Sequence, residues 1–267
     1  MPLAVCATPI GNLEDVTLRV LRELAEADLV LCEDTRRTKI LLERHGIEAK
    51  LLSYHEHNEA KRTAQVLPRL ESGERIALTS DAGLPGVSDP GAWLIQAALE
   101  AGVPVTVLPG PSAVETALVA SGLLGSQYRF LGYLPRGEKA RTELWDELGR
   151  WPHASVAFES PQRLPATLES LAAMWPDRLV AVCRELTKRF EDVVRGRADD
   201  VAAQFREPPK GEITLVVGGA PVAEGDEGEA LAALAELVEA GVGRRQAADV
   251  VARLTGTSRN RLYRGSL

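Results

Sequence analysis

The stretch SDAGLPGVSDPG, residues 80–91, combines three glycines, two prolines and two aspartates directly after the apolar run RIALT at 75–79. Glycine permits tight turns and a close approach of the backbone to a ligand, and proline fixes the shape of a turn. Asp81 and Asp89 can accept hydrogen bonds from a ribose hydroxyl or an amine. The composition of this loop therefore favours a binding site for a ligand with hydroxyl and amino groups.

Two more loops rich in glycine or proline follow apolar runs: TPIGNLEDVT at 8–17 and LPGPSA at 108–113. Open α/β sheets bind their ligands beyond the carboxyl ends of parallel strands. Each loop alone could be an ordinary turn between a strand and a helix, but the three together predict one ligand crevice. The chain has neither GxGxxG after its first strand nor GxxxxGK[ST], so the dinucleotide and P-loop classes lack their usual motifs.

Charged and polar side chains gather in five further motifs. Mixtures of hydrogen-bond acceptors and cations suit a site that handles the phosphates and hydroxyls of RNA. The motifs are EDTRRT (33–38), HEHNE (55–59), FESPQR (158–163), RELTK (184–188) and KGE (210–212).

Structural explanations stay open for several of these motifs. Residues 33–35 could cap the helix that follows them, and RELTK could be a salt-bridged strand end. His55 and His57 would lie on the same side of a strand, as two metal ligands would. No third ligand stands at a telling spacing, so we predict no metal site.

Strands that alternate with helices must position these loops. This alternation predicts a parallel sheet covered by helices on both faces, and we expect one α/β domain over residues 1–122. The apolar runs are 3–8, 28–33, 75–81 and 104–110, and the helical patterns between them include 17–27, 60–73 and 92–102.

A second set of elements follows YRFLGYLPRGEK, residues 128–139, whose Pro–Arg–Gly centre we interpret as an interdomain turn. Two strands of this set are so close in sequence that we expect a mixed sheet, within a second α/β domain at 123–220. The predicted strands are 155–160, 179–186, 193–198 and 212–219, and the helices are 163–174 and 198–205.

The C-terminal part has a different character. APVAEGDEGE at 220–229 has the composition of a linker, and helical patterns follow at 229–241, 244–256 and 258–264, the last with Ser258 as N-cap. A helix, the turn Thr-Gly-Thr and a helix that opens with arginines have the outline of a helix-turn-helix. We expect a small helical module at 226–267.

The charge of the chain is unevenly distributed. The net charge of −7 over 267 residues argues against a protein that binds nucleic acid over its whole surface. Residues 242–267, however, carry six arginines against Asp249 alone, a net charge of +5 that leaves −12 for the rest. A basic tail on an acidic body predicts an anionic partner for the tail, although a solvated helix face would have the same composition.

The cysteines and the apolar segments bear on the cellular compartment. Cys6, Cys32 and Cys183 lie in separate apolar runs, so neither a disulfide framework nor a zinc knuckle is predicted. No window has the length of a membrane span, and TPIGNLED interrupts the apolar start too early for a signal peptide. We expect a reduced, cytoplasmic protein without membrane contact.

Eight motifs occur in a characteristic order: TPIGNLEDVTLR, EDTRRT, HEHNE, SDAGLPGVSDPG, LPGPSA, FESPQR, RELTK and KGE. Together they resemble the tetrapyrrole methylase superfamily, and most closely its members that methylate a ribose 2′-oxygen of 16S ribosomal RNA. The resemblance covers nearly the whole chain, including the basic tail. It implies the tetrapyrrole methylase (class III methyltransferase) fold, an α/β fold of two domains with a small C-terminal helical module. It also implies S-adenosyl-L-methionine as the cofactor between the two domains, and a homodimer.

The resemblance also implies which residues bind the cofactor. The implied contacts are Pro9, Asp81, Gly83, Leu84, Ser112, Ala113, Phe158, Cys183 and Glu212. A ribose hydroxyl is a weak nucleophile, so a proton acceptor or a charge-stabilising partner should assist the transfer. From the remaining motifs we expect Glu159 or Glu185 to accept the proton. We expect Lys188 and Arg36 to bind the substrate or to stabilise charge.

The implied function is the 2′-O-methylation of one cytidine near the decoding centre of 16S ribosomal RNA. The expected partner is that RNA or the small ribosomal subunit, held in part by the basic tail. Two alternatives stay open. One is methylation of a tetrapyrrole-like small molecule, against which the basic tail argues, and the other is a non-catalytic RNA-binding assembly factor.

Overall fold

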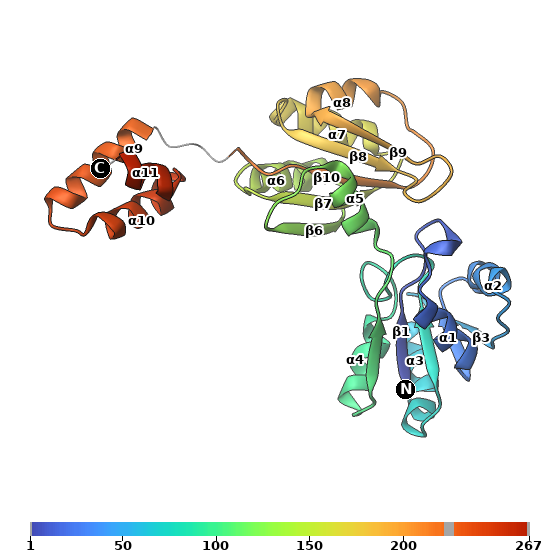
Figure 1. Ribbon diagram of the computed structural model, residues 1–267. Helices are drawn as coiled ribbons and strands as arrows, with labels where there is room; N and C mark the ends of the chain where they lie inside the picture. Colours follow the sequence, from blue (N-terminus) through green and yellow to red (C-terminus); the bar gives the residue numbers. More distant parts are fainter. Residues whose placement is uncertain (1, 222–226, 266–267) are drawn as a thin grey trace. The chain divides into compact units, whose positions relative to one another are not determined.

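The computed structural model describes residues 2–221 and 227–265, which form two compact units. The larger unit holds two five-stranded sheets, and the smaller holds the three helices that follow residue 226 together with the segment Arg150–Pro152 (Figure 1). The expected fold class is confirmed, with two α/β halves and a C-terminal helical module.

The first sheet is parallel throughout, with the strand order β3-β2-β4-β1-β5. Leu3 of β1 stands opposite Ile76 of β4 and Val105 of β5, so the central strands end at the same edge. The strands are β1 Leu3–Cys6, β2 Leu29–Cys32, β3 Leu51–Ser53, β4 Ile76–Thr79 and β5 Val105–Leu108.

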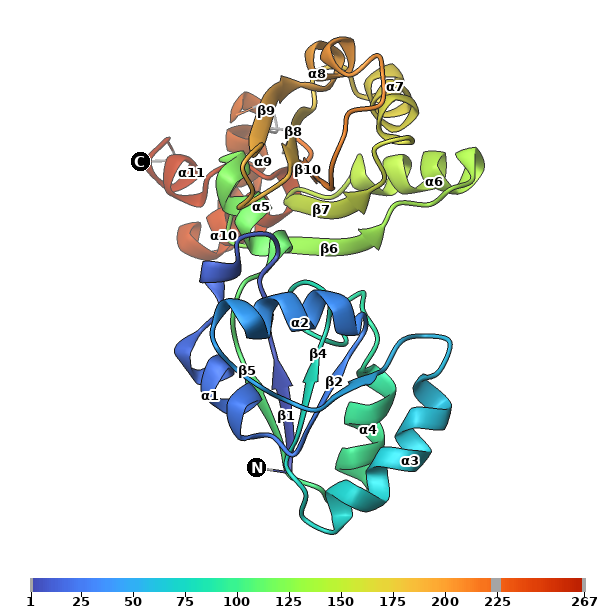
Figure 2. The same cartoon turned by 90° about the vertical axis from the view of Figure 1, so that its right-hand side faces the viewer.

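Two pairs of helices cover this sheet because successive side chains of a strand point to opposite faces. In β2, Leu29 and Leu31 join the core with α3 and α4, whereas Val30 joins the core with α1 and α2. Figure 2 shows the two pairs on opposite sides of the sheet. The helices are α1 Leu18–Glu26, α2 Thr35–Arg44, α3 Glu59–Glu71 and α4 Ala92–Glu100, and a short 3-10 helix, Leu13–Asp15, precedes α1.

The second sheet is mixed, as expected, with the order β6-β7-β10-β8-β9. Only β6 and β7 run parallel within it. Its strands are β6 Tyr128–Tyr133, β7 Ala154–Glu159, β8 Leu179–Arg184, β9 Asp192–Arg197 and β10 Ile213–Val217. The helices of this half are α5 Ala113–Ser121, α6 Glu138–Leu148, α7 Leu164–Met174 and α8 Ala198–Gln204.

A shared apolar core joins the two halves. Ile10, from the loop after β1, is buried in one cluster with Val114 and Leu118 of α5 and with Val156 and Val216 of the second sheet. The loop that leaves the first strand therefore packs on the second sheet, and the strand-end loops of both halves meet.

The interpretation of the Pro–Arg–Gly centre of residues 128–139 as an interdomain turn is wrong, because this turn lies within the second half. Residues Tyr128–Tyr133 form β6, the first strand of the second sheet, and α6 begins at Glu138, so only the residues between them turn. β6 is an edge strand, and its residues are partly exposed on both faces. It therefore lacks the alternation of apolar and polar residues by which a half-buried strand is recognised.

The C-terminal unit is a three-helix module with its own core. Its helices are α9 Glu227–Glu239, α10 Arg244–Thr255 and α11 Arg259–Gly265, close to the three predicted ranges. Its buried side chains include Leu234, Val251 and Leu262. The predicted linker 220–229 includes residues 222–226, which lie outside the described residues. No helix in the described part of the chain has the length and apolarity to cross a membrane.

Candidate active site

A cavity of about 680 Å³ lies among the strand-end loops of both sheets. The loop after β4 lines it with Asp81, Gly83 and Leu84, and the loop after β5 with Ser112 and Ala113. The second half contributes Phe158 and Glu159 from β7, Cys183 from β8, and Gly211, Glu212, Ile213 and Thr214 around the start of β10. We refer to it as the central cavity.

The central cavity gathers eight of the nine side chains expected to bind the cofactor, those of Asp81, Gly83, Leu84, Ser112, Ala113, Phe158, Cys183 and Glu212. The ninth, Pro9, lines an adjoining side cavity of about 260 Å³. The two cavities share Ile10, Arg37, Asp81, Ala82 and Glu212 in their linings.

Gly83 connects two of the strand-end loops. Its backbone accepts a hydrogen bond from the Thr8 N–H at 2.8 Å and donates one to the Thr8 carbonyl at 3.0 Å. Its φ of +77° is in the left-handed region, where a side chain would be strained. Gly83 therefore forms a tight turn, as expected of a glycine in residues 80–91, two residues after Asp81, which lines the cavity.

Asp81 is held between two groups of the loop and helix that follow β2. One of its oxygens accepts a hydrogen bond from the Asp34 N–H at 3.0 Å, and the other lies 3.4 Å from a guanidinium nitrogen of Arg37. Asp34 is the N-cap of α2, because its Oδ1 accepts from the Arg36 N–H at 2.9 Å. The capping explanation of this motif is thus supported at Asp34.

Arg36 and Arg37 have different surroundings although they are neighbours in the sequence. The Arg36 guanidinium bonds the Asp34 carboxylate at 2.6 Å, and hydrogen bonds from Arg36 lower the pKa of Asp34 to about 2. The Arg36 side chain is 88% exposed and lines none of the described cavities. Arg37, in contrast, lines both the central and the side cavity. The sequence analysis therefore selected the wrong one of the two arginines as a cavity residue.

Carboxyl groups crowd one end of the central cavity. Burial, followed by the negative charge of Glu33, raises the pKa of Asp89 to about 6. Burial and the charge of Asp81 likewise raise the pKa of Glu33. Glu33 and Asp89 also line a third cavity of about 780 Å³, here called the acidic cavity.

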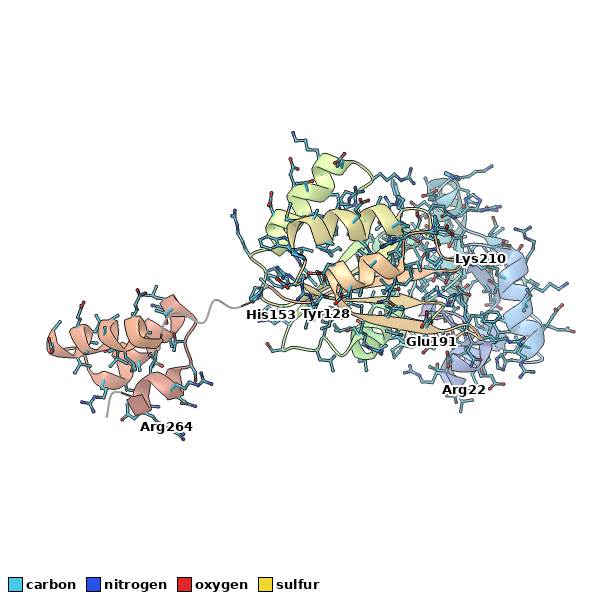
Figure 3. The ribbon with its side chains drawn as sticks, turned by 90° about the horizontal axis from the view of Figure 1, so that it is seen from above. Arg22, Tyr128, His153, Glu191, Lys210 and Arg264 are labelled. Carbon is cyan, nitrogen blue, oxygen red and sulfur yellow. The ribbon has the colours of Figure 1, made fainter. Side chains whose placement is uncertain are left out.

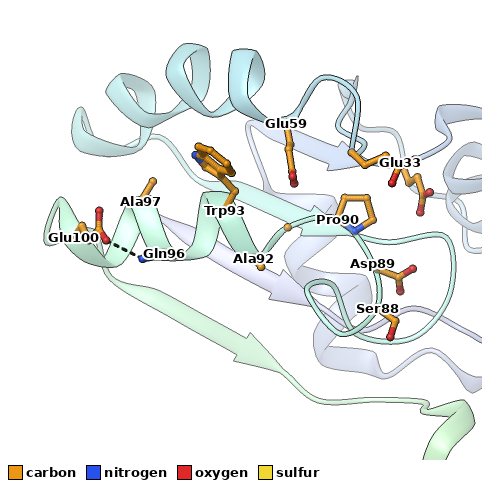
Figure 4. Close-up of a pocket in the computed structure, with 12 residues that line it drawn as sticks. Glu33, Glu59, Ser88, Asp89, Pro90, Ala92, Trp93, Gln96, Ala97 and Glu100 are labelled. Atoms are coloured by element: carbon orange, nitrogen blue, oxygen red, sulfur yellow. Dashed lines mark hydrogen bonds between the residues drawn. The ribbon is translucent and has the colours of Figure 1, made fainter. Parts of the chain in front are cut away.

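The acidic cavity lies between the start of α3 and the exposed side of α4 (Figure 4). Its carboxylates are those of Glu33, Glu56, Glu59, Asp89 and Glu100, and its described lining contains no Lys, Arg or His. Trp93 is 58% exposed on the same wall, and Gln96 donates a hydrogen bond to Glu100 at 3.0 Å.

Glu159 is buried and has donors at both carboxylate oxygens. One oxygen accepts from the Ser160 N–H at 2.7 Å and pairs with Arg163, and the other accepts from the Thr167 hydroxyl at 2.7 Å. Arg163 also donates to the carbonyl of Leu134 at 3.1 Å. This carboxylate therefore ties the end of β7 to α7, while it still lines the central cavity.

The RELTK loop is a hydrogen-bonded turn between β8 and β9. Glu185 and Thr187 both adopt left-handed backbone conformations, with φ of +51° and +64°. Glu185 accepts hydrogen bonds from the Glu212 N–H and from the Lys188 ammonium, both at 2.9 Å, which together lower its pKa. Lys188 also bonds Glu212 at 2.9 Å and lines the side cavity, so the salt-bridge explanation of this motif accounts for Glu185.

Two glycines allow the RELTK loop to pack this closely. A Cβ atom on Gly211, whose φ is +97°, would stand 2.4 Å from the Glu185 side chain. A Cβ atom on Gly11 would stand 2.5 Å from the Lys188 side chain. Next to Gly11, the Asn12 N–H donates to the Thr187 hydroxyl at 3.0 Å, so this loop connects the first strand-end loop to the second sheet.

The two histidines of HEHNE are not on a strand, and that prediction is wrong. They follow the end of β3 at Ser53, in the turn before α3. A ring nitrogen of His55 lies 2.9 Å from the Asn58 amide nitrogen, which fixes its ring within the turn. Among the described residues, no three His, Cys, Asp or Glu side chains group as metal ligands.

Sequence reasoning also missed a polar group on α5. Tyr128 donates a hydrogen bond to Glu115 at 2.6 Å, Ser112 donates to the other oxygen of Glu115, and all three line the central cavity. Glu115 stands three residues after the N-cap Ser112, which is the spacing of a capping box and the signal that could have identified it. Tyr128 belongs to β6, a strand that the sequence analysis did not predict.

Comparison with known proteins agrees with this arrangement. The family model of the Tetrapyrrole (Corrin/Porphyrin) Methylases matches residues 2–202. A solved structure of uroporphyrin-III C-methyl transferase from Thermus thermophilus, complexed with S-adenyl homocysteine, superposes with a TM-score of 0.58 at 18% identity. The superposition covers 81% of this chain and 96% of that one, and it shows that the two proteins are similar in fold. The chain belongs to the tetrapyrrole methylases.

Closer relatives narrow the family. The chain is 44% identical to the ribosomal RNA small subunit methyltransferase I of Micromonospora olivasterospora, over 98% of this chain and 85% of that protein. It is 44% identical to the protein of the same name from Thermotoga maritima, over 81% of this chain and 98% of that protein. The model of the RsmI C-terminal HTH domain matches residues 224–265. Within the tetrapyrrole methylases, the chain therefore belongs to the ribosomal RNA small subunit methyltransferase I family.

Gly211→Ala should destabilise the protein more than a backbone penalty alone. An alanine with positive φ costs about 1 kcal/mol, and the overlap with Glu185 should raise the loss of unfolding free energy to about 3 kcal/mol. Gly73→Ala is the matched control, because Gly73 has a φ of +92° with open space around it. Thermal denaturation of both variants compares the two costs, and equal shifts in Tm would contradict the tight packing of Glu185.

Asp89→Asn should stabilise the protein in a pH-dependent way. The pKa of Asp89 is raised from 3.8 to about 6, so the folded state keeps a proton that the unfolded state releases between these values. Stability from this group is therefore present below the lower value and lost as the pH rises through about 6. Asparagine does not titrate, so the variant should gain about 1 kcal/mol over the wild type at about pH 8, with little gain at about pH 4. Melting curves at both pH values, with exposed Asp15→Asn as control, test this, and an equal gain at both would contradict it.

Proposed function

We propose that this protein is an S-adenosylmethionine-dependent methyltransferase that acts on the ribosomal RNA of the small subunit. The finer proposal is 2′-O-methylation of a cytidine of 16S ribosomal RNA near the decoding centre. The observation that carries it is the central cavity, which gathers eight predicted cofactor residues from two sheets. The names of the relatives support the substrate class.

The cavity has properties that suit the cofactor. Its volume of about 680 Å³ is within the usual range for small-molecule sites. Carboxylates and the hydroxyls of Ser112 and Tyr128 offer partners for a ribose diol and an ammonium group, beside apolar walls such as Ile10 and Leu186. We propose Pro9, Asp81, Gly83, Leu84, Ser112, Ala113, Phe158, Cys183 and Glu212 as its contacts. When bound, S-adenosylmethionine supplies an activated methyl group on a sulfonium.

Lys188 is the best-placed cation for charge that develops on the attacking oxygen. Glu185 and Glu212 hold its ammonium at 2.9 Å each, in the lining of the side cavity. A preorganised cation favours the ionised form of a hydroxyl that it contacts, and the ionised oxygen is the stronger nucleophile toward the sulfonium carbon. In this proposal Glu185 positions Lys188 rather than accepting the proton.

The Glu159 carboxylate is already occupied by hydrogen bonds from Ser160 and Thr167 and by the ion pair with Arg163. The proton of the 2′-hydroxyl therefore needs another acceptor. Asp81 and Glu212 are the carboxylates that line both the central and the side cavity, so they lie where a ribose could meet the cofactor. Within the proposed catalytic set of Glu159, Glu185, Lys188 and Arg36, we assign Glu159 to anchoring β7 on α7. Arg36, on the exposed side of its cap, is assigned to an outer contact with RNA.

The remaining expectations belong to the same proposal. The partner is 16S ribosomal RNA or the small ribosomal subunit, and the protein acts in the cytoplasm as a homodimer. We divide it into domains at 1–122, 123–220 and 226–267. The last of these offers exposed arginines, among them Arg253, Arg261 and Arg264, as phosphate contacts (Figure 3).

Two other functions are distinguishable by experiment. The family description favours methylation of a tetrapyrrole-like small molecule as the second candidate. In that case the purified protein would bind S-adenosylmethionine but transfer no methyl group to RNA. A non-catalytic assembly factor would keep its cellular role when methyl transfer is abolished.

A methyl-transfer assay with Asp81→Ala tests the proposal directly. Labelled S-adenosylmethionine would be offered with purified protein and small subunits that lack the modification. The wild type should label one ribose 2′-oxygen, and Asp81→Ala should bind the cofactor at least about 10-fold more weakly, because it loses hydrogen bonds to a charged acceptor. Asp146→Ala removes an exposed carboxylate of α6 and is the control. Label on a base, or no label with cofactor bound, would refute the ribose reaction.

The basic module should determine how RNA affinity depends on salt. Each lost phosphate contact reduces the slope of log affinity against log salt by about one. The double variant Arg261→Gln with Arg264→Gln should therefore show a slope smaller by about two. Arg22→Gln, an exposed arginine of α1, is the matched control and should leave the slope unchanged (Figure 3). Equal slopes for the wild type and the double variant would remove the module from the RNA interface.

A further inference from the structure

The electrostatic character of the three cavities differs in a way that bears on how RNA approaches. The acidic cavity shares Glu33 and Asp89 with the central cavity. Its described lining has five carboxylates and no Lys, Arg or His. A polyanion placed there would be repelled by each of them. The side cavity shares Arg37 and Asp81 with the central cavity, and its lining also contains Lys188.

Among the described residues, Arg37 is the one Lys or Arg that lines both the central and the side cavity. In the described lining of the central cavity it is the one Lys or Arg. Its contact with Asp81 is 3.4 Å long, and its side chain is 61% exposed. A guanidinium has five N–H donors, so Arg37 can keep this contact and still bind a phosphate.

The walls of the side cavity also suit a nucleotide. Ile10, Leu13, Ile40 and Leu41 give it an apolar side, and Ile40 remains 56% exposed. Next to Arg37, α2 adds the exposed Arg36. Phosphate contacts set the register of a nucleic acid, and apolar surface can support a sugar or a base.

We propose that the RNA strand enters through the side cavity and that Arg37 binds the phosphate next to the target ribose. This inference rests on the proposed function and names the residue that positions the substrate. Lys188, which lines the same cavity, would then face the ribose oxygen, and the acidic cavity would stay free of RNA.

The test compares Arg37→Gln with Lys39→Gln, which removes the same charge from the same helix. Lys39 is 69% exposed, pairs with Glu43 and lines none of the three cavities. For Arg37→Gln we expect the KM for small subunits to rise about 10-fold and the salt slope of RNA affinity to fall by about one. The Kd for S-adenosylmethionine should change less than about 3-fold. Arg37→Lys should recover part of the loss, because it restores the charge but not the guanidinium geometry.

Several outcomes would overturn the inference. Equal effects of Arg37→Gln and Lys39→Gln would mean that only general charge matters. A weaker Kd for the cofactor with an unchanged KM for RNA would assign Arg37 to the cofactor site. A several-fold fall in the KM for RNA with Glu59→Gln, which removes a repelling charge from the acidic cavity, would place the RNA there instead.

The failure of this inference is separable from that of the proposed function. RNA binding by the full-length variants can be measured without turnover, by retention of a labelled 16S fragment. Suppose that the wild type transfers no methyl group but Arg37→Gln still weakens RNA binding more than Lys39→Gln. The proposed RNA path is then supported, and the proposed methyl transfer is refuted. If the wild type methylates RNA and the two variants bind RNA alike, the methyl transfer is supported and the proposed RNA path is refuted.

Discussion

The candidate site depends on the hydrogen bonds that hold residues 184–188 against the strand-end loops of both halves. Glu185 and Thr187 remain in left-handed conformations because Glu212, Lys188 and Asn12 supply their side chains with partners. Strain of this kind persists only where surrounding contacts over-determine the backbone. In return, the loop places Lys188 in the side cavity and closes the wall that Glu212 shares with the central cavity.

The distribution of charge explains how a chain with a net charge of −7 can act on RNA. Because the net charge of such a protein is negative, its affinity for a polyanion must come from a few local groups of cations. In the proposed function, the arginines of α10 and α11 provide binding that is largely independent of sequence. In the same proposal, Arg37 and Lys188 act at the reacting nucleotide, where geometry matters more than affinity. By that proposal, the carboxylates of the acidic cavity limit the directions from which RNA can reach the site.

Much of the fold and of the cavity lining could be predicted from the sequence. Short apolar runs identified β1, β2, β4 and β5, and because parallel strands end at one edge, the residues just after them had to meet. This reasoning, with the family resemblance, located Asp81, Gly83 and Ser112 in one cavity. It failed at β6, an edge strand without alternation, and at β3, which has only three residues.

The remaining differences arise from contacts that local sequence does not specify. Arg36 and Arg37 are alike in charge, but the cap Asp34 engages the first and leaves the second at the cavity. Likewise, Glu185 bonds a lysine three residues away and a backbone N–H of the distant Glu212, which only the folded chain brings together.

The bond between Asn12 and Thr187 joins residues 175 positions apart, so it belongs to the most non-local contacts of the larger unit. Contacts of such long range form only after the chain between them has folded, because the loop that they close is otherwise too costly in entropy. A ribosome must therefore release most of this chain before the site can exist. Partly synthesised protein would have its first sheet and its Asp81 loop, yet no complete cavity in which to bind a substrate.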